Sequence, residues 1–221
     1  MKKIIILLAF ILASLNADAH TLHNQKLKSL KFDLYRNDQY AGYHHIDLKW
    51  NNGAVEVKNT IHFGVKKLGI TFYDYKSEGV EKYNKEGKLL NFSSETNDNG
   101  KLKFCRIKLD GDGYQVDGSK FSGTLKNPFF LGSYWNHDLI TTSTQLSGIT
   151  CKKISQTVKS LPDQKFETAI KEFQTEAFDI KGDNGLDTQV WYDKETKMLV
   201  HQVLNKKGKW DYKLKSVEFS K

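Results

Sequence analysis

Short turn sequences recur about every ten residues along most of this chain, and they constrain its fold more than any other feature. Asparagine and glycine mark many of them, as in Asn52-Gly53 and Asn99-Gly100. Between the turns, apolar and polar residues alternate, most clearly over residues 55–63. Alternation places successive side chains on opposite faces of a strand. The pattern therefore predicts an antiparallel meander rather than strand–helix–strand units.

The turn at Asn52-Gly53 also predicts a register for its hairpin. A two-residue type I′ turn there brings Lys49 opposite Glu56 and Asp47 opposite Lys58. These are pairs of opposite charge on the outer face, and a slip of one residue would break both and mix the faces. On the inner face the same register pairs Trp50 with Val55, Leu48 with Val57 and His44 with Ile61.

Two more hairpins predict the same inner face. A turn at Asn99-Gly100 pairs Asp98 with Lys101, Phe92 with Ile107, and Ser94 with Cys105. A three-residue loop at residues 37–39 pairs Leu34 with Gly42 and Phe32 with His44. Their agreement predicts an all-β fold: one curved antiparallel sheet of about ten or more strands, a half-barrel or partly open barrel with one short helix.

Two segments depart from the alternation. Residues 127–140 are aromatic and irregular, which indicates a loop carrying the short helix, with Ser133 as a candidate N-cap. In residues 166–177 the spacing of Phe166, Ile170 and Phe173 fits a helix, whereas the β-rich surroundings favour two short strands. We expect the strands and keep the helix as the alternative.

The first nineteen residues have the pattern of an export signal. Lys2 and Lys3 precede an apolar run over residues 4–15, which is too short to span a bilayer. Ala17-Asp18-Ala19 then predicts cleavage before His20, with an uncleaved anchor as the alternative. We expect a signal peptide over residues 1–19 and a single domain over residues 20–221, located in the periplasm and not membrane-spanning.

The formal net charge is +8, and the basic residues are mostly lysines scattered along the whole chain. Scattered lysines between apolar residues are typical of a solvated outer sheet face. No arginine-rich cluster is present, and the expected export argues against a nucleic-acid partner. We therefore expect no nucleic-acid partner, with mild attraction to anionic lipid or cell-wall polymer as the functional alternative.

Two cysteines, Cys105 and Cys151, would be exposed to an oxidising compartment after export. A pair of this kind often forms a disulfide, but the sequence does not show whether the two Cβ atoms meet. The disulfide is thus possible and left open. Neither cysteine lies in an activating motif, which argues against a cysteine nucleophile.

Candidate metal and catalytic motifs are weak. His45 and His62 would lie diagonally on the outer face, with no further ligand to complete a site. Asp110-Gly111-Asp112-Gly113 resembles a calcium loop, but Tyr114 stands where an oxygen ligand is needed. No acidic pair stands out in an apolar setting. We expect no metal, no cofactor and no catalytic residues.

Several short motifs resemble an uncharacterised family of exported bacterial β-proteins, a domain of unknown function. They are Phe-Asp-Ile-Lys-Gly at residues 178–182, Val-Trp-Tyr-Asp at residues 190–193, Leu199-Val200, the turn at Gly208, Gly42, and Tyr-Trp-Asn at residues 134–136. One departure is the turn at residues 194–197, which lacks the glycine typical of the family. Relatives of this family resemble the half-barrels of the periplasmic lipoprotein carriers LolA and LolB. The resemblance implies a curved half-barrel and a carrier-like role.

The aromatic content of 12% suggests what such a sheet could bind. We expect a non-catalytic binding protein whose concave face takes a lipid or other apolar ligand, lined by His44, Trp50, Phe63 and Trp135. Residues 129–135 would form a lid with Gly132 as its flexible point. The first alternative is a structural or protein-interaction module with a filled core, and the second is an uncharacterised envelope hydrolase. The sequence leaves the oligomeric state open.

Overall fold

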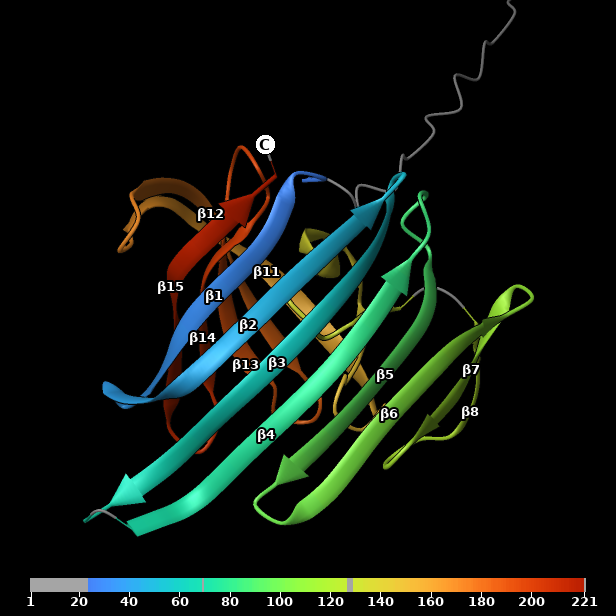
Figure 1. The fold of residues 1–221 in the computed structure, drawn as a ribbon, viewed down its shortest axis with the longest axis horizontal. Helices are drawn as coiled ribbons and strands as arrows, with labels where there is room; N and C mark the ends of the chain where they lie inside the picture. Colours follow the sequence, from blue (N-terminus) through green and yellow to red (C-terminus); the bar gives the residue numbers. More distant parts are fainter. Residues whose placement is uncertain (1–23, 69, 127–128, 221) are drawn as a thin grey trace, which may run out of the picture.

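The computed structural model describes residues 24–68, 70–126 and 129–220, which form one strongly curved sheet (Figure 1). The one helix among these residues is the 3-10 helix η2 (His137–Thr141). The prediction of an all-β, partly open curved sheet with one short helix is confirmed. The fifteen strands are β1 (Leu27–Arg36), β2 (Gln39–Asn51), β3 (Ala54–Lys67), β4 (Ile70–Tyr83), β5 (Leu89–Asp98), β6 (Lys101–Asp110), β7 (Gly113–Gly118), β8 (Gly123–Lys126), β9 (Phe130–Leu131), β10 (Thr144–Leu146), β11 (Lys153–Glu167), β12 (Glu172–Gly182), β13 (Asp187–Asp193), β14 (Leu199–Asn205) and β15 (Lys209–Phe219).

Strands that follow each other in the sequence are neighbours in the sheet, with one interruption. The order runs from β8 down to β1, continues with β15, and then runs down to β9. The ladder between β1 and β15 pairs Leu27 with Phe219 and so joins the first and the last strand of the described residues. Neighbouring strands are antiparallel except β9 and β10, which are parallel. The sheet is therefore a ring with one seam, between β8 and β9.

The predicted register of the β2–β3 hairpin is confirmed. Lys49 pairs with Glu56 and Asp47 with Lys58, while Trp50, Leu48 and His44 pair with Val55, Val57 and Ile61. Asn52 and Gly53 both have positive φ, at 48° and 82°, as a type I′ turn requires. The ion pairs of Glu56 and Lys58 are formed with β4 on the other side of β3: Glu56 contacts Lys82 at 3.0 Å and Lys58 contacts Glu78 at 3.3 Å.

The other two hairpins keep the predicted inner pairs, but one turn differs. Phe92 pairs with Ile107 and Ser94 with Cys105. Between β1 and β2, Leu34 pairs with Gly42 and Phe32 with His44, yet Arg36 pairs with Gln39. The loop thus has two residues rather than three, because Asn37 and Asp38 both adopt positive φ, at 47° and 64°. A bulge next to Leu34 absorbs the extra residue and restores the register.

The two irregular segments are resolved by the structure. Residues 166–177 belong to β11 and β12, so the expected strands are confirmed over the helix. The short helix lies within the aromatic segment, but its N-cap is Asn136 and not Ser133. Asn136 has extended backbone angles, and its side-chain oxygen accepts a hydrogen bond from the Asp138 backbone N–H at 3.0 Å. An amide three residues further along therefore provides the cap.

Cys105 and Cys151 form a disulfide that links the two sides of the seam. Cys105 lies on β6 and Cys151 in the turn between β10 and β11, and both side chains are fully buried. Further bonds support the same junction, since Ser94 Oγ donates to the Gly148 carbonyl and Lys120 N–H to the Thr150 carbonyl. The open sheet is thus closed by side chains and a turn where no β-ladder joins β8 to β9 in the described residues.

The β11–β12 hairpin folds over the outer face of the sheet. Phe166 on β11 stacks on His201 of β14 with ring centroids 4.3 Å apart, although β12 and β13 lie between these strands. A bulge after Leu161 allows β11 to bend. The hairpin covers a small second apolar cluster that includes Trp191. Burial there lowers the pKa of His201 to about 4.

Candidate functional site

The inner face of the sheet is filled by its own side chains. Leu30, Leu34, Ile46 and Val57 are fully buried there, and the segment between β8 and β11 packs onto them. That segment contributes Leu131, Trp135, Leu139 and Leu146, which are all buried. The concave face is therefore a packed core, and we call the segment between β8 and β11 that closes it the cover.

The four residues predicted to line a ligand site lie in different places. Trp50 and Trp135 line one cavity at the end of the sheet where β2 turns into β3, which we call the mouth. Phe63 lies away from it, with its ring 4.6 Å from Tyr75 and 4.4 Å from Trp210. His44 is buried beside Phe32, with ring centroids 6.0 Å apart. The structure thus brings together two of the four.

A buried carboxylate, Glu81 on β4, lies beneath the mouth and was missed from the sequence. It accepts hydrogen bonds from Asn59 Nδ2 at 2.9 Å, from Tyr83 Oη at 2.7 Å and from Trp135 Nε1 at 3.0 Å. Burial raises its pKa, and these donors only partly oppose the rise. The signal that could have found it is its register, because Glu81 pairs with Val57 of the predicted inner face.

His44 extends this buried network on the far side of Asn59. Its Nε2 lies 3.3 Å from Asn59 Oδ1, and burial lowers its pKa to about 4. His44 is therefore a neutral imidazole held among polar and aromatic neighbours. Glu81 accepts a hydrogen bond from Trp135 and so holds this cavity-lining side chain in place, although neither Glu81 nor His44 lines the cavity.

The mouth cavity has a volume of about 30 Å³. Such a space holds about two water molecules, which is far less than an acyl chain needs. Its walls are mainly apolar and its rim is polar. The lining residues are Asn24, Leu27, Leu48, Trp50, Trp135, Asn136, His137, Thr196, Lys197 and Met198.

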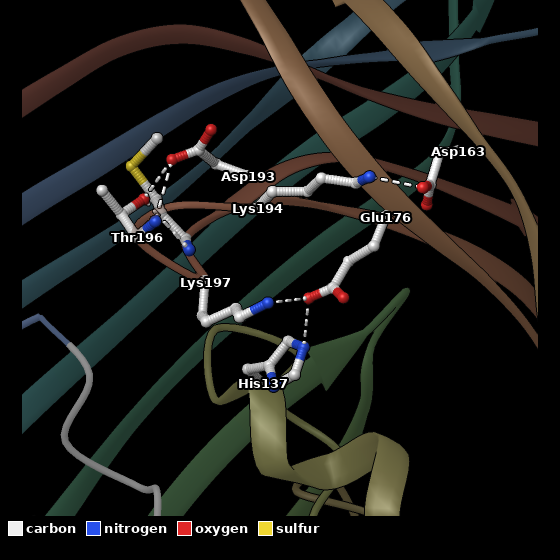
Figure 2. A network of polar contacts seen from close by, with 8 residues as sticks. His137, Asp163, Glu176, Asp193, Lys194, Thr196 and Lys197 are labelled. Carbon is white, nitrogen blue, oxygen red and sulfur yellow. Dashed lines mark hydrogen bonds and ion pairs between the residues drawn. The ribbon is translucent and has the colours of Figure 1, made fainter.

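The rim is a network of charged side chains (Figure 2). Glu176 on β12 accepts from His137 Nε2 and from Lys197 Nζ, both at 2.8 Å. Burial lowers the pKa of His137, which Glu176 only partly counteracts, so the ring is neutral at neutral pH. Thr196 donates to Asp193 at 2.7 Å and shapes the turn that carries Lys197. The network fixes the polar groups that face the cavity.

Two amide groups of the mouth are buried without a hydrogen-bond partner among the described residues. They are Nδ2 of Asn136 and Nδ2 of Asn24, and both residues line the cavity. Buried donors without an acceptor are uncommon and usually mark a site for water or a ligand.

A larger hollow of about 630 Å³ lies on the outer side of Trp50, where β1 separates from β2; we call it the rim hollow. Trp50 and Leu48 line both spaces. The Trp50 side chain is anchored between them by a hydrogen bond from Nε1 to the Leu27 carbonyl at 2.8 Å. The rim hollow is lined by Gln25, Lys28, Asp47, Leu48, Lys49, Trp50, Glu56, Lys58 and Ser220.

Gly132, predicted as a flexible point, is held by close packing. Its N–H donates to the Leu146 carbonyl at 2.9 Å. A Cβ at this position would lie 2.4 Å from Oε1 of Gln145. A larger residue here would therefore displace the Gln145 side chain, which donates from Nε2 to Gln156 Oε1 at 2.6 Å.

The candidate metal residues lie apart from the mouth. His62 Nε2 is 3.1 Å from Asp74 Oδ1, and His45 stacks on Tyr43 with ring centroids 4.5 Å apart. Across residues 24–68, 70–126 and 129–220, no three His, Cys, Asp or Glu side chains are placed to hold one ion. Nor does any helix in these ranges have the length and apolar character needed to cross a membrane.

Comparison with known proteins agrees with the fold and assigns a family. The structure is similar to the crystal structure of a beta-barrel-like protein of domain of unknown function DUF1849 from Brucella abortus, with a TM-score of 0.67 and 11% sequence identity. The similarity covers 90% of this chain and 99% of that one. No curated protein matches the sequence. The model of the domain of unknown function DUF6134 matches residues 32–215, so the prediction of an uncharacterised β-protein family is confirmed and the chain belongs to the DUF6134 family.

Proposed function

We propose that this protein is a non-catalytic binding protein of the cell envelope that holds a small ligand with an apolar body at the mouth. The observation that carries the proposal is the position of Trp50, which lines both the mouth cavity and the rim hollow. Together with Leu48 it offers an apolar wall beside a few buried polar groups. That composition is typical of small-molecule sites in proteins.

The mouth suits a ligand better than the concave face does. Phe63 and His44 are already in contact with Tyr75 and Phe32, so a ligand among them would have to displace packed rings. At the mouth, the ligand body would lie in the rim hollow and only its tip would enter the cavity. Apolar contact there contributes about 25 cal/mol for each Å² removed from water.

The test is a titration of delipidated protein with N-phenyl-1-naphthylamine, an uncharged apolar dye whose emission rises in apolar surroundings. We expect saturable binding that weakens on the order of tenfold in Trp50→Leu, because an aromatic wall is lost. Phe63→Leu is the matched control, since it removes an aromatic ring away from the mouth. Equal weakening in both variants, or no saturable binding, would contradict the proposal.

A second candidate is a structural or protein-interaction module without a cargo. The packed inner face under Leu131, Trp135 and Leu146 favours it, because a filled core leaves little space for a ligand. Native mass spectrometry of protein purified from envelopes separates the two candidates. A small molecule that travels with the protein supports binding, whereas bare protein together with no dye binding supports the module.

The cell-envelope location is part of the proposal. It rests on the signal pattern of residues 1–19, which lie outside the described residues. N-terminal sequencing of the exported protein should begin at His20. An intact Met1 in the envelope fraction would contradict the cleavage.

A further inference from the structure

We propose that the mouth cavity is a pocket for an uncharged carbonyl group, held by the buried amide of Asn136. The ligand class is therefore an ester, amide or ketone whose apolar part lies against Trp50. This inference rests on the proposed function and adds the chemistry of the head group to it.

The orientation of the Asn136 amide is fixed by the fold. Its Oδ1 accepts the Asp138 backbone N–H at 3.0 Å as the cap of η2, so the other end of the amide is the NH₂ group. Asn136 is only 5% exposed, and its Nδ2 has no partner in the described part of the chain. A group that can only donate requires an acceptor, which in this cavity is the oxygen of a water molecule or of the ligand that displaces it.

A second donor lines the same cavity. Nδ2 of Asn24 is also buried and without a partner in the described ranges. A carbonyl oxygen has two lone pairs and accepts two hydrogen bonds, so one oxygen would satisfy both amides. The volume of about 30 Å³ fits a head group of this size and little more.

The charges at the rim favour a neutral head group over a carboxylate. In Figure 2, two carboxylates contact residues that line the cavity: Glu176 contacts His137 and Lys197, and Asp193 accepts from Thr196. The Asp163–Lys194 pair in the same view is separate from them, and neither of its residues lines the cavity. Lys197 is already paired with Glu176 at 2.8 Å, and an anionic ligand would face that same carboxylate. A carbonyl oxygen accepts from the amides without adding a negative charge.

The apolar lining sets the rest of the ligand. Leu48, Trp50, Trp135 and Met198 surround the cavity, and Trp50 continues into the rim hollow. A chain or ring attached to the carbonyl would leave the cavity over this surface. Binding thus combines one specific polar contact with apolar contact of variable length.

The experiment compares three ligands of matched length: methyl octanoate, methyl octyl ether and octanoate. Each displaces N-phenyl-1-naphthylamine from the full mature protein. We expect the ester to bind on the order of tenfold more tightly than the ether, which lacks the carbonyl oxygen. Octanoate should bind more weakly than the ester because of the carboxylates at the rim.

The variant Asn136→Asp isolates the donor. It keeps the oxygen that caps η2 and replaces the NH₂ group by a second oxygen, which as part of a carboxylate can only accept. Burial of this carboxylate should lower the thermal midpoint, and circular dichroism checks that the fold is retained. Ester binding should fall toward the level of the ether, while ether binding should change less because the ether oxygen is a weaker acceptor than a carbonyl oxygen. Asn136→Ser, which also keeps a capping oxygen, provides the same comparison if the first variant folds poorly.

The outcomes separate the two proposals. If ester and ether bind equally and Asn136→Asp changes neither, the carbonyl pocket is wrong while ligand binding at the mouth stands. If octanoate binds as tightly as the ester, the preference for a neutral head group is wrong. If none of the three ligands binds, both proposals fail.

Discussion

The disulfide across the seam makes a sharp prediction about stability. Cys105 and Cys151 connect β6 to the turn before β11, and the chain between them crosses the only interruption of the sheet in the described residues. We consider the double variant Cys105→Ala/Cys151→Ala, because alanine leaves no buried hydroxyl without a partner. The variant keeps each β-ladder and removes only the covalent closure.

The magnitude follows from the length of the closed loop. The two cysteines are 46 residues apart in the sequence. Loop-closure entropy for a loop of this size amounts to about 4 kcal/mol at room temperature. For a domain of about 200 residues, each kcal/mol changes the melting temperature by about 2–4 °C, so we expect a decrease of roughly 8–16 °C.

The assay is equilibrium unfolding in urea, followed by tryptophan fluorescence, for the wild type and the variant. Adding a reductant is the control: it should lower the stability of the wild type toward that of the variant and leave the variant unchanged. The dependence of free energy on urea should also steepen, because the unfolded chain is no longer cross-linked. A loss below about 1 kcal/mol would refute the reasoning and show that the turn contacts alone close the seam.

Three further predictions concern buried positions. Gly118→Ala should destabilise the protein by about 1–3 kcal/mol, since a Cβ there would lie 2.5 Å from the Cys151 Cβ. Gly64→Ala is the control, because its φ is not positive either and the nearest atom to a Cβ there lies 3.6 Å away. Burial raises the pKa of Glu81, so the free energy of unfolding of the wild type should fall by about 1.4 kcal/mol per pH unit as the pH rises from 4.5 toward the folded-state pKa. In urea titrations at several pH values, Glu81→Gln should lack this slope. Parallel curves for the two proteins would contradict the prediction. Burial lowers the pKa of His201 from 6.5 to about 4, so protonation of its ring should destabilise the fold as the pH falls through that interval. The loss should be at most about 3 kcal/mol, because Asp211 lies 3.2 Å from the ring and favours its protonated form. His201→Phe should remove this loss, and an unchanged acid transition would contradict the burial.

Local turn chemistry explains why the hairpin registers could be predicted. Asn52-Gly53 and Asn99-Gly100 specify their own backbone angles, so the pairing on either side follows without information from the rest of the chain. The β1–β2 loop was predicted one residue too long, because the sequence does not show that Asp38 adopts positive φ and that a bulge restores the pairing. The disulfide pairing stayed open for a related reason: it depends on how the ring closes.

The candidate site was only partly predictable, because alternation specifies the face of a side chain but not its height along the sheet. His44 and Trp50 share the inner face of β2, yet six residues of extended strand separate them by about 20 Å. Trp135 belongs to the irregular segment between β9 and η2, and it lines the same cavity as Trp50. The alternation of apolar and polar residues does not predict the course of that segment. The pairing of Glu81 with Val57 could not be predicted by counting from the turn after β3, because the β3–β4 register contains a shift after Val65.

The ladder between β1 and β15 has a consequence for the connectivity of the protein. It places Leu27 in the first described strand opposite Phe219 in the last, while the one seam in the described part of the chain falls between β8 and β9, which follow each other in the sequence. The order of the strands around the ring would therefore stay the same if the chain began at another strand. A circular permutant that links Ser220 to Asn24 and opens between Lys126 and Phe129 would retain each ladder. The β1–β15 ladder, which joins residues far apart in the natural sequence, would become a local hairpin in this permutant. Cys151 and Cys105 would then lie in opposite halves of the chain.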